Sequence, residues 1–253
     1  YVSLNRIQDA LNDFGQAIAL DADDSQNFIE RAKVYILNNE YDMASSDLKQ
    51  ALRLNPDSSD ALSLNGFLAV LTGKHSEGFD ALNQAIETTP FNHFAIVKRA
   101  QAHLAEGQLS QALADMDRAI AWAPINAGYL SQRAKIYLAL GELEAALADF
   151  DSSIGVSGEP GAFDPEYAEA LLDRSNVQMN LGNTNAAVED ALSVIHILKT
   201  RFSAPEWESY RSDIEVILAD AYEMLGDLFT RMGKTRFFDS AAKKWYQLAS
   251  DLR

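Results

Sequence analysis

Residues 127–160, AGYLSQRAKIYLALGELEAALADFDSSIGVSGEP, contain the pattern that decides the fold of this chain. Apolar residues recur at intervals of three and four through two stretches, which Gly141 separates. That spacing places side chains on one face of a helix, and glycine accepts the left-handed conformation in which many helices end. The stretch therefore predicts two amphipathic helices that pack against each other as a hairpin.

The same arrangement recurs along the chain with a period of 34 residues. Proline lacks the amide donor that would continue a helix, and asparagine is next to glycine in tolerating the left-handed conformation. The prolines that follow this period are Pro56, Pro90 and Pro124, and the residues of the glycine slot are Asn39, Gly73, Gly107 and Gly141. A period of 34 residues is typical of helix–turn–helix solenoids.

Four further slots hold the predicted core. Small residues in two of them allow two helices to approach closely, and apolar residues in the other two recur at helical spacing. The small slots hold Ala32, Gly66, Ala100, Ala134 and Ser175, then Ala10, Ala44, Gly78, Ala112, Ala146 and Ala187. The large slots hold Phe14, Leu48, Leu82, Met116 and Phe150, then Ile18, Leu52, Ile86, Ile120, Ile154 and Ile195.

This pattern resembles the tetratricopeptide repeat family, through Arg133-Ala134-Lys135-Ile136-Tyr137, then Leu140-Gly141, then Ala146, Phe150 and Ile154. The resemblance implies an all-α fold, a right-handed α–α superhelical solenoid of helix-turn-helix repeats. We expect tetratricopeptide repeats over residues 1–160, with a partial repeat at 1–24 and full repeats at 25–58, 59–92, 93–126 and 127–160. We expect an irregular continuation over 161–253, with a repeat at 168–201, an extended helix and a degenerate capping repeat at 219–253.

The register breaks at two places. Residues 155–165 insert glycines and prolines where the single proline should stand, so we expect a hinge loop there. Residues 202–218 extend the first helix of the last repeat, and we expect this long helix to cap the stack. Tyr1 falls eleven positions into the repeat, so we also expect further chain before it.

Four repeats carry an arginine in one slot and an aspartate sixteen residues later. The pairs are Arg31 with Asp47, Arg99 with Asp115, Arg133 with Asp149, and Arg174 with Asp190. Repeat 59–92 lacks both partners, with Asn65 and Ala81 in their places. This spacing puts one member on each helix, where a guanidinium can bind a carboxylate through two hydrogen bonds. The arginines could instead bind an external anion, but we interpret the pairs as structural because losing one member strands a partly buried charge.

No pattern in the chain indicates catalysis or a cofactor. Cysteine is absent, and His75, His93, His103 and His196 lack the spacing of metal ligands. His103 takes the slot of Tyr35 and Tyr137, so we expect it to replace an aromatic core residue. The sequence predicts a protein that is not an enzyme.

Charge argues against nucleic acid as a partner. The formal net charge is −16, which repels phosphate backbones, and no apolar stretch is long enough to span a membrane. Residues 1–198 hold 28 acids and 12 bases, whereas residues 199–253 hold 9 of each. The excess of acids therefore precedes Lys199.

The resemblance also implies a binding groove, because the family's first helices line the inside of a curved stack and contact an extended or helical peptide. It places these residues in the groove: Ile29, Lys33, Leu64, Phe67, Phe94, Val97, Lys98, Gln101, Gln132, Lys135, Asn176 and Asn180. We expect the apolar residues among them from 64 to 97 to be exposed, since the core uses other slots. A partner with an apolar anchor and nearby acids would fit this groove, because Lys33, Lys98 and Lys135 are bases in an acidic array.

Glu30, Leu64 and Phe67 stand where the family's chaperone-binding members need basic or amide groups, which argues against a chaperone-tail receptor. A polar groove with incidental apolar residues is the alternative interpretation. The basic C-terminal segment also has two readings. Its bases are Arg231, Lys234, Arg236, Lys243 and Lys244, with Phe237, Phe238 and Trp245 among them. They fit a solvated terminal helix, or a surface for self-association or an acidic partner.

Three functional classes stay open. The chain is a protein–protein interaction scaffold or adaptor that recruits a peptide or helical segment, or a regulatory or substrate-docking module of a larger enzyme or assembly. The third class is an architectural subunit that assembles with copies of itself.

Overall fold

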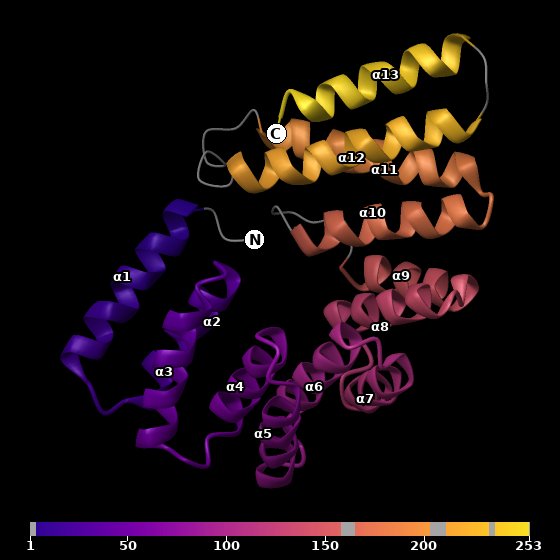
Figure 1. The fold of residues 1–253 in the computed structure, drawn as a ribbon. Helices are drawn as coiled ribbons and strands as arrows, with labels where there is room; N and C mark the ends of the chain where they lie inside the picture. Colours follow the sequence, from indigo (N-terminus) through magenta and orange to yellow (C-terminus); the bar gives the residue numbers. More distant parts are fainter. Residues whose placement is uncertain (1–3, 158–164, 203–210, 233–235, 253) are drawn as a thin grey trace. The chain divides into compact units, whose positions relative to one another are not determined.

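The computed structural model describes residues 4–157, 165–202, 211–232 and 236–252, and every regular element in these ranges is an α-helix (Figure 1). The helices are α1 (Leu4–Leu20), α2 (Ser25–Leu37), α3 (Tyr41–Leu54), α4 (Ser59–Leu71), α5 (His75–Thr88), α6 (His93–Ala105), α7 (Leu109–Trp122), α8 (Ala127–Leu140), α9 (Leu143–Ser157), α10 (Pro165–Asn180), α11 (Thr184–Phe202), α12 (Arg211–Met232) and α13 (Arg236–Ser250). The predicted all-α repeat fold is confirmed.

The chain divides into two compact units, which we name the N-terminal unit (Val2–Pro124) and the C-terminal unit (Ile125–Arg253). In the N-terminal unit α1 packs against α2, and the hairpins α2–α3, α4–α5 and α6–α7 follow in order. In the C-terminal unit the hairpins α8–α9, α10–α11 and α12–α13 pack successively, as the neighbouring helices α10 to α13 show in Figure 1. This division differs in place from the boundary after residue 160 that the sequence suggested.

Capping side chains mark the starts of the first helices α2, α4, α6 and α8, and residues with positive φ mark the turns within the hairpins from α2–α3 to α10–α11. At the starts of the first helices, Asp24, Ser58, Asn92 and Asn126 accept hydrogen bonds from backbone amides of the first turn. These amides have no partner within the helix, so a capping side chain stabilises the helix start. At the turns within the hairpins, the positive φ angles belong to Asn39, Gly73, Gly107, Gly141 and Gly182. The predicted glycine slot therefore marks the turns, with Gly182 displaced by the inserted residues.

The predicted core slots lie inside the two units. The first of the two large slots is fully buried at four positions: Leu48, Leu82, Met116 and Phe150. Four alanines of the second small slot are fully buried too: Ala44, Ala112, Ala146 and Ala187. Burial of this apolar area is the main favourable contribution to packing of the hairpins.

Each predicted arginine–aspartate pair bridges the two helices of its hairpin through two hydrogen bonds. In the first, Arg31 Nε donates to Asp47 Oδ2 at 2.7 Å and Nη2 donates to Asp47 Oδ1 at 2.8 Å. Arg99, Arg133 and Arg174 form the same two bonds with their aspartates at distances of 2.6 to 2.9 Å. The aspartates are buried, with exposures of 6 or 7%. Hydrogen bonding to the aspartate is the main reason that the pKa of Arg31, Arg99 and Arg174 is raised.

Two of these arginines also connect successive hairpins. Arg99 Nη1 on α6 donates to Asn83 Oδ1 on α5 at 2.8 Å. Arg174 Nη1 on α10 donates to Asp151 Oδ1 on α9 at 2.7 Å. One guanidinium therefore ties its own hairpin together and holds the second helix of the preceding hairpin.

The hairpin α4–α5, which lacks the ion pair, packs through two glycines instead. A Cβ added to Gly66 would lie 2.6 Å from the carbonyl oxygen of Gly78, and one added to Gly78 would lie 2.7 Å from that of Gly66. Both distances are shorter than real Cβ atoms adopt, so neither position has room for alanine. Close backbone contact replaces the charged bridge in this hairpin.

Part of the loop predicted for residues 155–165 is helical in the structure. Gly155 to Ser157 belong to α9, and Pro165 begins α10, so neither end of the proposed hinge loop is a loop. Residues 158–164, the remainder of that prediction, lie outside the described residues. The extended helix is α12, which packs against α10, α11 and α13. It begins at Arg211 and not at residue 202, because Phe202 ends α11, and residues 203–210 lie outside the described residues.

We predict that Arg133→Ala lowers the free energy of unfolding by about 2–4 kcal/mol, because Asp149 would lose two hydrogen bonds in a buried position. Urea unfolding followed by circular dichroism measures the change. The control is Arg53→Ala, since Arg53 is exposed and bonds only Gln50 of its own helix. Equal effects of the two substitutions would show that the pair adds no stability.

We also predict that Gly66→Ala lowers the free energy of unfolding by about 1–3 kcal/mol, because the added methyl group forces α4 and α5 apart. The matched control is Gly15→Ala, where the nearest atom to a new Cβ is Arg31 Nη1 at 4.0 Å. Helix propensity alone favours alanine by up to about 1 kcal/mol, so the control should be neutral or stabilising. A stabilising Gly66→Ala would contradict the close approach.

Candidate functional site

The predicted groove is only partly a surface in the N-terminal unit. Leu64 and Val97 are 3 and 5% exposed, so the expectation that both belong to an exposed apolar patch is wrong, and Ile29, also predicted for the groove, is 1% exposed. Ile29 and Leu64 belong to the core cluster that joins α2, α3 and α4. The reason is that the first helices pack against one another, and this contact uses slots that we had assigned to the surface.

The remaining predicted residues of the N-terminal unit converge on one cluster, the lysine–phenylalanine cluster, which consists of Lys33, Phe67, Phe94 and Lys98. Lys98 Nζ lies 4.9 Å from the centre of the Phe67 ring and 5.3 Å from that of Phe94. Lys33 Nζ lies 5.6 Å from the Phe94 ring centre. All four side chains are partly exposed. They come from the first helices α2, α4 and α6, which pack successively in this unit.

Ammonium groups above aromatic rings are attracted by the negative ring faces, which offsets part of the cost of leaving water. The two lysines differ in their other contacts. Lys33 Nζ lies 2.7 Å from Glu30 Oε1, whereas Lys98 Nζ donates to the neutral oxygen Oε1 of Gln101 at 2.9 Å. Burial, followed by repulsion from Lys33, lowers the pKa of Lys98 to about 8. The cluster therefore combines apolar ring surface with two different amines. Lys33 is paired with a carboxylate, and Lys98 is largely removed from water.

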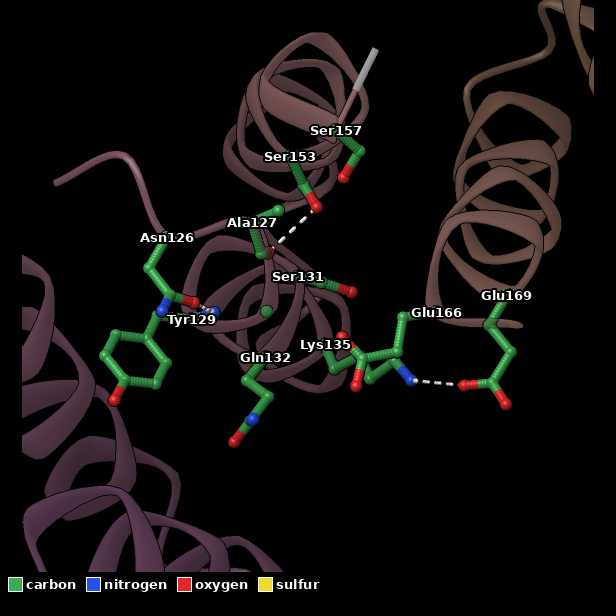
Figure 2. Close-up of a pocket in the computed structure, with 11 residues that line it drawn as sticks. Asn126, Ala127, Tyr129, Ser131, Gln132, Lys135, Ser153, Ser157, Glu166 and Glu169 are labelled. Carbon is green, nitrogen blue, oxygen red and sulfur yellow. Dashed lines mark hydrogen bonds and ion pairs between the residues drawn. The ribbon is translucent and has the colours of Figure 1, made fainter. Parts of the chain in front are cut away.

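The first helices of the C-terminal unit line a polar pocket of about 400 Å³ between α8, α9 and α10 (Figure 2). Its lining includes the predicted residues Gln132 and Lys135 together with Glu166 and Glu169. Lys135 Nζ lies 3.9 Å from Glu169 Oε2, the contact that Figure 2 marks with a dashed line, and 3.1 Å from Asp173 Oδ2. Lys135 is therefore engaged by carboxylates of α10.

A second hollow of about 250 Å³ continues along α8, α10 and α12, and it contains Asn176. Asn180, one turn further along α10, is exposed and donates through Nδ2 to Asn176 Oδ1 at 3.2 Å. The acids Glu169, Asp173 and Asp220 line this hollow with Lys135. The two units thus differ in character, because the N-terminal unit presents amines and rings where the C-terminal unit presents carboxylates and amides.

Two histidines lie beside carboxylates: His75 Nδ1 is 2.8 Å from Glu106 Oε1, and His103 Nε2 is 4.0 Å from Asp115 Oδ2. His103 stacks on Phe79, with 4.6 Å between ring centres, and its Nδ1 lies 2.6 Å from Gln108 Oε1. This partly buried position agrees with its predicted role as an aromatic substitute. Among the described residues, no group of three or more acidic, histidine or cysteine side chains could hold a metal ion.

The basic C-terminal segment is described only in part. Arg231, Lys243 and Lys244 are exposed, whereas Trp245 stacks on Tyr222 of α12 with 5.5 Å between ring centres. Trp245 therefore contributes to the core of this unit. Lys234 lies outside the described residues, as do the side chains of Arg236, Phe237 and Phe238.

Sequence reasoning missed the way in which Lys98 lies against two rings from different helices. Phe94 and Lys98 are four residues apart on α6, a spacing that does predict neighbours on a helix surface. The contact with Phe67 depends on how α4 packs against α6, so no local pattern reveals it.

Among the described residues, no helix is long and apolar enough to cross a membrane.

Comparison with known proteins agrees with this architecture. Residues 26–58 and 97–165 match family models described as tetratricopeptide repeats. No curated protein matches the chain in sequence.

Solved structures share the fold. One is PilW, described as a widely conserved type IV pilus biogenesis factor, with a TM-score of 0.61 at 21% identity over 81% of this chain and 91% of that one. A tetratricopeptide repeat protein from Parabacteroides merdae has a TM-score of 0.60 at 17% identity, over 97% of this chain and 78% of that one. MamA from Desulfovibrio magneticus has a TM-score of 0.55 at 15% identity, over 71% and 97%. The family matches therefore identify tetratricopeptide repeats at residues 26–58 and 97–165, and the solved structures show the same fold.

Proposed function

We propose that this chain is a protein-interaction scaffold that binds a peptide or helical segment of a partner, and that the lysine–phenylalanine cluster is the main contact. One observation carries the proposal: on three successive first helices, each of two partly exposed amines lies within 6 Å of the centre of at least one phenyl ring. Aromatic side chains are enriched at the centres of protein interfaces, and polar and charged groups form the rim around them.

The chemistry of the cluster favours a partner with an apolar anchor and nearby acids. Phe67 and Phe94 offer ring surface to an aliphatic or aromatic side chain, and Lys33 and Lys98 attract carboxylates. Because the whole chain carries a formal net charge of −16, such a partner would be repelled by most other surfaces. Local positive charge would therefore direct an acidic segment to this cluster.

The remaining groove residues extend the proposal. Gln101 accepts the hydrogen bond of Lys98 and borders the cluster. In the C-terminal unit, Gln132, Lys135, Asn176 and Asn180 offer amides and one amine on the corresponding helices. We assign them weaker, polar contacts with the partner. PilW, whose fold is similar, is described as a factor in pilus biogenesis. That description supports an assembly role in general and identifies no partner for this chain.

Phe67 is a poor probe of binding because it also packs against the buried residues Val70, Leu82 and Ala102. Truncation to alanine would remove core contacts and lower stability, contrary to what the sequence alone suggested for an exposed residue. The two lysines are better probes because both side chains are partly exposed and can be changed without opening a cavity.

We predict that peptides selected by the intact chain from a random-peptide display library contain an aromatic or aliphatic residue flanked by Asp or Glu. Removing both amines with Lys33→Gln and Lys98→Gln should weaken such a peptide at least about tenfold, or about 1.4 kcal/mol. Fluorescence anisotropy of the labelled peptide measures the affinity.

The control removes the same charge elsewhere in the N-terminal unit, through Lys49→Gln and Lys74→Gln at exposed positions. It should change the affinity less than about twofold at moderate salt, where distant surface charges are screened. Equal losses in the two double variants would place the binding surface away from the cluster, and so would selected peptides without acids.

A further inference from the structure

Lys98 is a partly buried amine that has no carboxylate partner among the described residues. Its contacts are the oxygen of Gln101, the rings of Phe67 and Phe94, and repulsion from Lys33. Charged groups that leave water are normally paired, because desolvation costs more than ring contacts return. An ammonium at this position therefore lacks a compensating negative charge, which a bound anion could supply.

The charged groups on the surrounding helices are already engaged. On α2, Glu30 accepts from Lys33 and from Gln26. On α4 the titratable residue is Asp60, and it accepts a hydrogen bond from Asn92 Nδ2 at 2.8 Å. On α6 itself, Arg99 bonds Asp115, and His103 faces Phe79 and Gln108. His93 is the other titratable residue of α6, and it lies at the helix start. No acid in these contacts compensates Lys98.

We propose that binding of an acidic peptide at the lysine–phenylalanine cluster is coupled to uptake of one proton by Lys98. The inference rests on the proposed function, since it needs an acidic ligand at this site. In the free protein, burial and repulsion from Lys33 make Lys98 lose its proton at a lower pH than an ordinary lysine. A ligand carboxylate beside Nζ supplies the missing opposite charge and favours the ammonium form, so the peptide and the proton bind together.

The lowered pKa of Lys98, about 8 in the free protein, sets the range of pH in which this coupling operates. Below pH 8 the free and bound proteins both carry the ammonium, so affinity is independent of this group. Above pH 8 the free protein loses the proton, whereas the complex retains it up to a higher pKa. Affinity should then fall by up to about tenfold for each pH unit, the slope of a one-proton linkage. The cluster would release acidic partners as the pH rises.

The first test measures binding of a selected acidic peptide that contains no Lys, His or Tyr, from about pH 7 to about pH 9.5. Affinity for the unchanged protein should fall above pH 8. In Lys98→Arg the fall should disappear, because a guanidinium stays protonated throughout this range. Lys33→Arg should retain it. A peptide with Gln in place of Glu should bind weakly and without the pH dependence.

The second test needs no ligand and compares unfolding of the unchanged protein with that of Lys98→Met. Between the folded-state pKa of about 8 and the ordinary value of 10.5, the unfolded chain holds a proton that the folded chain has lost. The unchanged protein should therefore gain stability relative to the variant as the pH rises through this range, and the difference should be constant below it. A difference that does not change between pH 8 and pH 10.5 overturns the proton linkage.

The two failures can be told apart. Acidic peptides that bind at the cluster with the same affinity at pH 7 and pH 9 overturn the proton linkage and leave the proposed function standing. Failure of every selected peptide to depend on Lys33 and Lys98 overturns the proposed function, whatever the second test shows.

Discussion

Close approach of the two helices in each hairpin is the constraint on which the rest of this structure depends. Small residues in two slots bring the backbones together, and the space beside them is filled by large buried residues such as Leu48 and Phe150. At that separation an arginine on one helix reaches an aspartate on the other with both of its hydrogen bonds. The hairpin α4–α5 shows that the approach is the primary requirement, because it keeps the contact through Gly66 and Gly78 and dispenses with the ion pair.

The arginines extend this constraint from one hairpin to the next. In a repeat array each unit is stable only when it packs against a neighbour, so contacts between hairpins determine whether the array unfolds together or in parts. Arg99 and Arg174 take part in both kinds of contact, since each bonds an aspartate of its own hairpin and a residue of the preceding one. The guanidinium of each thereby becomes a partly buried structural element that two hairpins share.

Packing of the hairpins also creates the candidate site. When α2, α4 and α6 pack successively, Ile29, Leu64 and Val97 are covered, and the larger Phe67 and Phe94 remain partly exposed beside Lys33 and Lys98. The same packing partly buries Lys98, and among the described residues no acid lies beside its amine. Its chemistry is thus a consequence of where the first helices meet. The corresponding surface of the C-terminal unit lacks this feature, because Lys135 is engaged by Glu169 and Asp173.

The sequence by itself determined the helices, the turns and the ion pairs, because each depends on residues at most 34 positions apart whose spacing repeats. Gly141 ends a helix through its own backbone freedom, and Arg133 finds Asp149 because both belong to one hairpin. The tertiary structure alone decided which of the predicted groove residues are buried. Ile29 and Phe67 are both apolar residues of the same surface in the family pattern, yet one lies in the core and the other does not. Exposure and the pKa of Lys98 depend on how neighbouring hairpins pack, and that packing is set by many weak contacts between side chains of different hairpins.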